Sequence, residues 1–241
     1  AVLGFNSPSG RWSTYNTPME GTKCANYHSI NFQCRPGSPD LNCCSVNAPR
    51  GVASVYDWML TDNDGTLCLN FYEDMYAELS NGLTVEISGG YPATNRITVK
   101  VNSNGLKQKI AFRIPEWSVN SVIVSDGETF RPAAGKYFAI KKIWDSEITI
   151  EFDFTPYTEE GGGDYTGKSS IYAGPILYAF DNAENPQIDF ENLPVISGKE
   201  LEEAAPVLQT DGSITLSFSN GVVLTDFYHA GVSGSSYKTW F

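Results

Sequence analysis

The chain has 241 residues, of which 41% are hydrophobic and 13% aromatic, a composition typical of a globular protein with a sizeable core. Its 28 acidic and 16 basic residues give a net charge of -12 at pH 7, and no run of Lys or Arg interrupts this acidity. A nucleic-acid backbone would be repelled, and no segment approaches the roughly 20 apolar residues that span a bilayer, so we expect neither nucleic acid nor membrane as a partner.

The first residues, Ala1 to Phe5, are apolar and include neither an initiator Met nor a capping residue. Free termini are usually polar and frayed, so we expect the numbering to start at a boundary made by processing, proteolysis or cloning. An ordinary mature terminus is the alternative. No intact signal peptide is visible, so the compartment stays open, with a preference for a secreted or periplasmic location.

The N-terminal part predicts loops and then one helix. Residues 5–47 are rich in Asn, Ser, Pro and Gly and show little periodicity, which indicates ordered loops with short strands. A helix is expected from Pro49 to Leu60, because Asn47 can cap it and Pro49 suits a first turn. Its apolar residues fall at helical spacing on one face: Val52, Val55, Tyr56 and Met59.

After the turn at residues 63–65, the pattern changes to short segments rich in β-branched and aromatic residues. Alternation is regular in residues 147–154, so their apolar side chains must share one buried face: Ile148, Ile150, Phe152 and Phe154. The same holds for Thr84–Ile87. Twelve strands are expected: Thr66–Phe71, Asp74–Leu79, Leu83–Gly89, Arg96–Asn102, Gln108–Ile114, Ser121–Ser125, Tyr137–Ile140, Glu147–Phe154, Ser170–Ala173, Ile176–Phe180, Ser213–Ser217 and Val222–Phe227.

These strands have no expected helix between them, which favours a sandwich over a parallel sheet. The acidic, Pro-bearing stretch 182–206 is expected to form a long surface connection. We therefore predict an all-β fold: an antiparallel β-sandwich or jelly roll, with an N-terminal loop-rich segment and one short helix.

The cysteines supply the most informative local pattern. Cys43 and Cys44 are adjacent, Cys24 and Cys34 precede them, and Cys68 follows the helix. Adjacent cysteines rarely bond to each other because the ring is strained, whereas two adjacent thiolates can both reach a soft metal such as zinc. Two buried structural thiols are the alternative, and a disulfide between Cys24 and Cys34 is another. Five cysteines leave at least one unpaired.

Five segments carry a resemblance to a known family, in one order along the chain: WSTYNTPMEG at residues 12–21, SPDLNCCSVNAPR at 38–50, AFRIPEWS at 111–118, IYAGPILYA at 171–179 and YKTWF at 237–241. The first two resemble the end of the catalytic domain of the β-L-arabinofuranosidases of glycoside hydrolase family 127. The next two are similar to strands of the β-sandwich in that family, and the last is similar to the family's usual end. An ordered set of motifs is more specific than any one of them.

The resemblance implies a retaining glycosidase whose nucleophile is a cysteine thiolate held on zinc, while a glutamic acid protonates the leaving oxygen. By position, Cys43 matches the nucleophile, and Cys43 and Cys44 match two zinc ligands. Tyr15 matches a residue near the sugar. The implied substrates are L-arabinofuranosyl-type plant glycans, and the implied partner is therefore carbohydrate.

The resemblance also places the acid, the remaining zinc ligands and the sugar-binding histidines upstream, in an α/α barrel that this sequence lacks. Residues 1–62 are then the end of a catalytic domain, and residues 63–241 are a β-sandwich region of one or two packed sandwiches. Zinc usually takes four ligands, and Cys24, Cys34 or Glu20 would have to complete the set. We expect zinc to be absent or weakly bound.

Three functional hypotheses follow from these observations. The chain is a portion of a family 127-like enzyme that needs a catalytic domain supplied from elsewhere and is not competent alone. Alternatively, it is a stand-alone carbohydrate-binding or accessory module. A purely structural domain is the third hypothesis.

Other residues also invite a functional reading. Glu159, Glu160 and Asp164 surround three glycines and fit either a calcium loop or, as we favour, a solvated flexible loop. His229 has no carboxylate at a recognisable spacing and is interpreted as structural. Four aromatic residues could stack on sugars, but core packing is favoured for most of them: Trp117, beside Glu116, and Tyr137, Trp144 and Tyr157.

Overall fold

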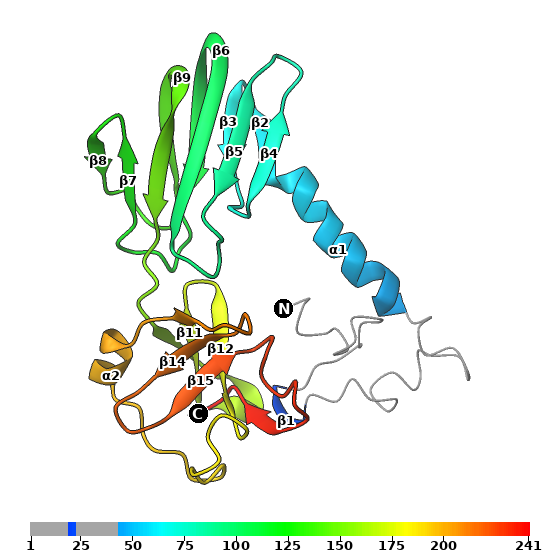
Figure 1. The fold of residues 1–241 in the computed structure, drawn as a ribbon, viewed down its shortest axis with the longest axis vertical. Helices are drawn as coiled ribbons and strands as arrows, with labels where there is room; N and C mark the ends of the chain where they lie inside the picture. Colours follow the sequence, from blue (N-terminus) through cyan, green and yellow to red (C-terminus); the bar gives the residue numbers. More distant parts are fainter. Residues whose placement is uncertain (1–18, 23–42) are drawn as a thin grey trace. The chain divides into compact units, whose positions relative to one another are not determined.

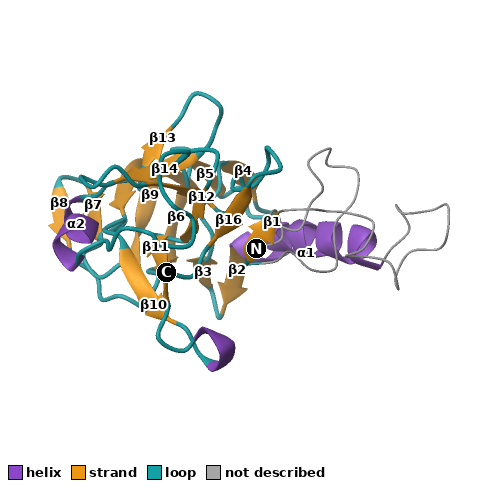
Figure 2. Cartoon of the chain, turned by 90° about the horizontal axis from the view of Figure 1, so that it is seen from below, coloured by secondary structure: helices purple, strands orange, loops and turns teal. Residues whose placement is uncertain are grey.

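The computed structural model describes residues 19–22 and 43–241, and strands dominate this part of the chain (Figures 1 and 2). The predicted all-β fold is confirmed, because the strands form two eight-stranded sheets. Within the described residues, none of the helices is long and apolar enough to cross a membrane.

The elements follow one another along the chain with few helices among them. In order they are β1 (Glu20–Thr22), α1 (Cys43–Met59), β2 (Leu60–Asn63), β3 (Thr66–Leu69), β4 (Met75–Glu78), β5 (Thr84–Ser88), β6 (Arg96–Arg113), β7 (Val122–Ser125), β8 (Glu128–Phe130), β9 (Tyr137–Glu151), β10 (Tyr157–Glu160), η3 (Gly163–Tyr165), β11 (Ser169–Ala173), β12 (Ile176–Asp181), α2 (Gly198–Glu203), β13 (Val207–Leu208), β14 (Ile214–Ser217), β15 (Val223–Asp226) and β16 (Ser236–Lys238).

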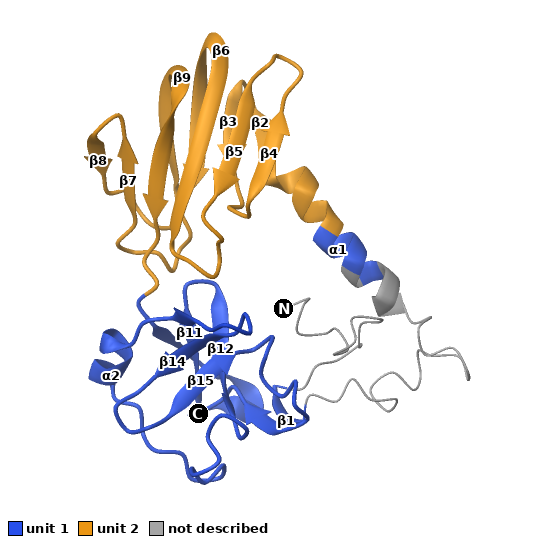
Figure 3. Ribbon diagram, in the orientation of Figure 1, with its two compact units in different colours: residues 1–52, 155–241 blue, residues 53–154 orange. Residues whose placement is uncertain are grey.

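The chain divides into two compact units (Figure 3). Unit 1 comprises residues 1–52 and 155–241, and unit 2 comprises residues 53–154. The sheet of unit 1 has the strand order β1-β16-β12-β15-β14-β13, with β11 beside β12 and β10 beside β11. The sheet of unit 2 has the order β2-β3-β6-β9-β7-β8, with β5 beside β6 and β4 beside β5.

Two long strands, β6 and β9, organise unit 2. They pair antiparallel along their lengths, with a register shift between Asn102 and Lys107. At this shift Asn104 and Gly105 adopt positive φ angles of 51° and 76°, which Gly tolerates without a steric penalty. The first half of β6 pairs with β5 and the second half with β3. This one strand therefore joins the β4–β5 pair and the β2–β3 pair into a single sheet.

The predicted buried face of unit 2 is confirmed. The alternating positions of β9 and the residues that follow it are all buried in one apolar cluster: Ile148, Ile150, Phe152 and Phe154. Val85 and Ile87 of β5 join them, as their alternation predicted. Each such side chain contributes about 1.5 to 3 kcal/mol on burial, so period-two alternation accounts for the core of this unit.

Several details of the predicted strands are wrong. Segments 96–102 and 108–113 form the single strand β6, and segments 137–140 and 147–151 are joined in β9, so the predicted strands end later than the observed ones, which stop at Arg113 and Glu151. The irregularity at residues 102–107 interrupts the register without ending the strands. In addition, β3 pairs parallel to β6 and not antiparallel. The short strands β1, β2, β8, β10, β13 and β16 were not expected.

The predicted helix starts too late. Helix α1 begins at Cys43, so Asn47 and Pro49 lie inside it and not at its N-terminal end. Pro49 was expected in the first turn because proline has no N–H to donate, yet the helix tolerates the loss of that one bond. The stretch 182–206 also contains α2, whose N-terminus is closed by a capping box between Ser197 and Glu200.

Candidate functional site

The predicted nucleophile and zinc ligands lie at the start of a helix. Cys43 and Cys44 are the first two residues of α1, where the sequence predicted a loop. Only their backbone positions are described. Tyr15, Cys24 and Cys34 lie outside the described residues, so the structure does not test their predicted roles. The first backbone N–H groups of a helix have no partner within it and carry a partial positive charge, which suits an anion.

The remaining cysteine is separate from that pair. Cys68 lies in β3, is half-buried and is a free thiol. Its Sγ is 3.8 Å from the carbonyl oxygen of Thr66. No group of three or more His, Cys, Asp and Glu side chains that could hold a metal ion occurs among residues the structure describes.

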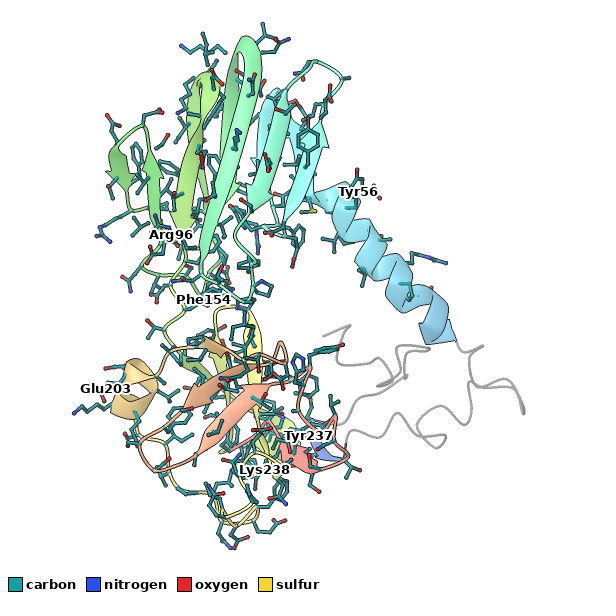
Figure 4. All side chains as sticks on the ribbon, in the orientation of Figure 1. Tyr56, Arg96, Phe154, Glu203, Tyr237 and Lys238 are labelled. Carbon is teal, nitrogen blue, oxygen red and sulfur yellow. The ribbon has the colours of Figure 1, made fainter. Side chains whose placement is uncertain are left out.

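Helix α1 carries exposed apolar side chains. Val52, Tyr56 and Trp58 are 51%, 78% and 54% exposed, and Tyr56 is labelled on the helix in Figure 4. Met59, the last residue of the helix, is buried. Val52 and Tyr56 are four residues apart and therefore lie on one side of α1, whereas Trp58 lies on a different side. Helices depend on packing of an apolar face for most of their stability, so the side of α1 that carries Val52 and Tyr56 is suited to a partner.

The candidate sugar-stacking aromatics have different environments. Trp144 is fully buried and donates from Nε1 to the Gln108 carbonyl at 2.9 Å. Trp117 packs edge-on against Phe152, with centroids 5.8 Å apart. Core packing is confirmed for these two residues. Tyr137 is the exception to core packing, because it is 52% exposed.

Tyr137 and the motif at residues 113–117 line a small polar cleft of about 330 Å³ in unit 2. The Tyr137 hydroxyl donates to Oδ1 of Asn70 at 2.5 Å. Arg113, Glu116 and Lys136 contribute the charged groups of this cleft. In unit 1, Tyr157 is half-buried and stacks on Tyr172 with centroids 5.6 Å apart.

The acidic residues near the glycine run are separated by secondary structure. Glu159 and Glu160 lie exposed in β10, whereas Asp164 lies in the short 3₁₀ helix η3. The segment 159–164 is therefore only partly the loop that the sequence predicted. Its exposure agrees with the solvated interpretation.

The sequence interpretation missed a carboxylate beside His229. Nδ1 of His229 lies 2.8 Å from Oδ2 of buried Asp226. Asp226 also accepts hydrogen bonds from the backbone N–H of His229 at 3.1 Å and of Ile214 at 2.8 Å. Burial and this nearby carboxylate raise the pKa of Tyr178. The three-residue spacing at the end of β15 was the available signal, since a turn brings such positions together.

Comparison with known proteins relates this arrangement to one family. Residues 66–155 match the family model described as "Beta-L-arabinofuranosidase, GH127 middle domain". The non-reducing end β-L-arabinofuranosidase of Bifidobacterium longum subsp. longum is 28% identical over 185 residues, which cover 70% of this chain and 28% of that protein. The matched family domain and unit 2 therefore occupy nearly the same residues.

Solved structures of similar fold belong to the same family. A GH127 β-L-arabinofuranosidase from Geobacillus stearothermophilus T6 superposes with a TM-score of 0.77 at 16% identity, covering 99% of this chain and 44% of that one. The GH127 β-arabinofuranosidase BT3674 gives a TM-score of 0.74 at 16% identity and covers 99% and 43%. The chain thus spans less than half the length of these relatives. The family resemblance is confirmed: this chain is related to the β-L-arabinofuranosidases of glycoside hydrolase family 127, and its residues 66–155 match the model of that family's middle domain.

Proposed function

We propose that this chain forms the β-sandwich portion of a family 127-like glycoside hydrolase that acts on L-arabinofuranosyl-type plant glycans. The observation that carries the proposal is the match of residues 66–155 to the family's middle domain, directly after a helix that starts with Cys43 and Cys44. In this proposal, residues 1–62 end a catalytic domain and residues 63–241 support it.

The proposed nucleophile is Cys43. Thiols near a helix N-terminus are biased towards the thiolate, which is the reactive form. The Sγ atom would displace the leaving oxygen from the anomeric carbon, and a carboxylic acid would protonate that oxygen. Water would then cleave the carbon–sulfur bond, with the same configuration at the anomeric carbon after two displacements. The acid is not identified in this chain, so the reaction needs a group supplied from elsewhere.

The exposed face of α1 supports such a shared site. Val52 and Tyr56, which lie on one side of the helix, leave apolar surface in water, and burial of large side chains contributes about 1.5 to 3 kcal/mol each. We therefore assign this face to contact with the remaining part of a catalytic domain. That contact would place the start of α1, and so Cys43, at the edge of the substrate site.

Zinc fits this chain only in part. The thiolates of Cys43 and Cys44 are soft ligands of the kind that zinc prefers, and bound zinc would keep a thiol deprotonated. Zinc sites take about four ligands, and the described residues do not supply a further set. We therefore derive no step through the metal.

The isolated chain tests the proposal. We expect no turnover of an aryl β-L-arabinofuranoside, because general acid catalysis alone contributes about 10² to 10⁴ in rate and positioning of the sugar contributes more. After dialysis against a mild chelator, elemental analysis should show far less than one zinc per chain. Turnover that Cys43→Ser abolishes would contradict the need for a supplied acid. Stoichiometric zinc that Cys44→Ser removes would show a complete metal site.

A further inference from the structure

Unit 1 contains a groove of about 810 Å³ that the proposed reaction does not use. One side is the face of its sheet, and the other is the connection at residues 190–201, which ends in α2. This volume lies within the roughly 300 to 1,000 Å³ of ordinary small-molecule sites.

Strand alternation directs specific side chains into the groove. Along β16 and the residues after it, Lys238 and Trp240 line the groove, whereas Tyr237 and Thr239 are buried. Figure 4 labels Lys238 and Tyr237 as neighbours on β16. Because successive side chains of a strand point to opposite faces, the groove and the interior of this sheet use alternate residues. Ile171, Val222 and Leu224 also line it.

The outer wall of the groove is held by hydrogen bonds. The Nζ of Lys238 donates to the carbonyl of Phe190 and lies 4.5 Å from the centroid of its ring. Farther along the wall, Nδ2 of Asn220 donates to the Val195 carbonyl at 3.2 Å. Because these hydrogen bonds already hold the wall in one conformation, binding of a ligand does not have to order it. This lowers the entropic cost of binding.

The groove combines aromatic rings with a matched pair of charges. Trp240 stacks on Tyr165, with centroids 4.9 Å apart and an interplanar angle of 20°. Nζ of Lys168 lies 3.9 Å from Oε2 of Glu20, and both side chains are about half exposed, at 44% and 48%. The Nε1–H of Trp240 is buried, and none of the described residues accepts a hydrogen bond from it. A buried donor without an acceptor is unfavourable, so a ligand hydroxyl that reached this N–H group would be favoured.

We propose that this groove binds a neutral oligosaccharide. Aromatic and aliphatic surfaces suit the apolar faces of sugar rings, and the charged groups can exchange hydrogen bonds with hydroxyl groups. The groove holds both signs of charge, and the chain as a whole carries a net charge of -12, which disfavours anionic ligands. The choice of sugar rests on the proposed function, because the family relationship points to carbohydrate substrates.

Calorimetric titration of the whole chain with a linear arabinofuranose trisaccharide tests this inference. We expect measurable binding that Trp240→Ala weakens about ten-fold, as loss of one stacked ring predicts. The double variant Glu20→Gln with Lys168→Ala alters only half-exposed side chains and should also weaken binding, which keeps the test valid if Trp240→Ala does not fold. Tyr76→Ala, which removes an exposed ring from unit 2, is the matched control and should bind like the unaltered chain.

Nuclear magnetic resonance adds a local readout. The indole N–H signal of Trp240, assigned by its loss in Trp240→Phe, should shift during titration while the buried Trp144 signal stays in place. The Cys43→Ser variant should bind the trisaccharide in the groove as the unaltered chain does. The test of the groove is therefore independent of the test of Cys43 as the nucleophile. Absence of binding at about 10 mM trisaccharide, where even a 1 mM site would be nearly saturated, would overturn the inference. Equal affinity in the unaltered chain and both groove variants would do the same.

Discussion

The two units bury different kinds of side chain. The interior of unit 2 is dominated by one large apolar cluster built from alternate strand positions, and the polar residues buried in this unit are all serines: Ser103, Ser118, Ser121 and Ser125. Unit 1 also has apolar strands, but it buries two carboxylates and an amide: Asp181, Asp226 and Asn185. Asp181 accepts from the backbone N–H of Gly231 at 2.7 Å and of Ala183 at 2.9 Å. Asn185 bonds both the N–H and the carbonyl of Val223, each at 2.8 Å.

The difference shows how each unit is specified. Apolar burial is not directional, so unit 2 depends on volume and on the face to which each residue points. The polar groups of unit 1 instead fix particular backbone atoms of its connections, because a buried polar group must find its partner. The candidate binding groove lies in unit 1. There, hydrogen bonds hold loops in place without filling the space between them.

The largest expected effect is in the apolar unit. Ile150→Ala should lower the free energy of unfolding by about 2 to 5 kcal/mol, because it leaves a cavity among fully buried neighbours. Ile143→Ala is the matched control on the same strand, since Ile143 is 59% exposed. Its cost should stay within about 0.5 kcal/mol. Denaturant unfolding measures both, and equal costs would show that β9 has been assigned to the wrong face.

A polar substitution in unit 1 should have a smaller and more local effect. Asp181→Ala leaves the buried N–H group of Gly231 without its acceptor, at a cost of about 1 to 3 kcal/mol. Amide hydrogen exchange should accelerate at Gly231 while the Ile150 amide of unit 2 is unchanged. Asp164→Asn, at an exposed position of the same unit, is the control. Faster exchange in both units would mean that this carboxylate stabilises more than its own unit.

The smallest effect concerns pH at α2. Hydrogen bonds from the Ser219 hydroxyl and then from Ser197 lower the pKa of Glu200 from its ordinary value of 4.5. The pKa of Glu200 is lower in the folded chain than in the unfolded chain. These bonds therefore stabilise the helix fully at pH values above the unfolded pKa, and this stabilisation is lost as the pH falls through the folded pKa. Acid titration should therefore shift the Ser197 and Glu200 amide signals. In Glu200→Gln those shifts should be absent, and their persistence would point to another carboxylate.

The sequence predicted the apolar unit better than the polar one. Regular alternation at residues 147–154 correctly placed Ile148 and Ile150 inside, because strand geometry converts a local pattern directly into burial. The bond between Asp181 and Gly231 joins residues 50 positions apart, and no local pattern encodes it. Likewise, the pairing of Asp226 with His229 needed the turn after β15, and the start of α1 was hidden by Pro49, which ordinarily marks a first turn.

The central claim is that Cys43 works at the edge of a domain that this chain does not complete alone. The most direct measurement joins the chain behind the part of the Bifidobacterium longum relative that precedes its matched region, and follows hydrolysis of an aryl β-L-arabinofuranoside. We expect turnover that Cys43→Ser abolishes and that Cys68→Ser, at the half-buried free thiol of β3, leaves intact. A folded, active fusion whose rate is the same with and without Cys43 would contradict the claim.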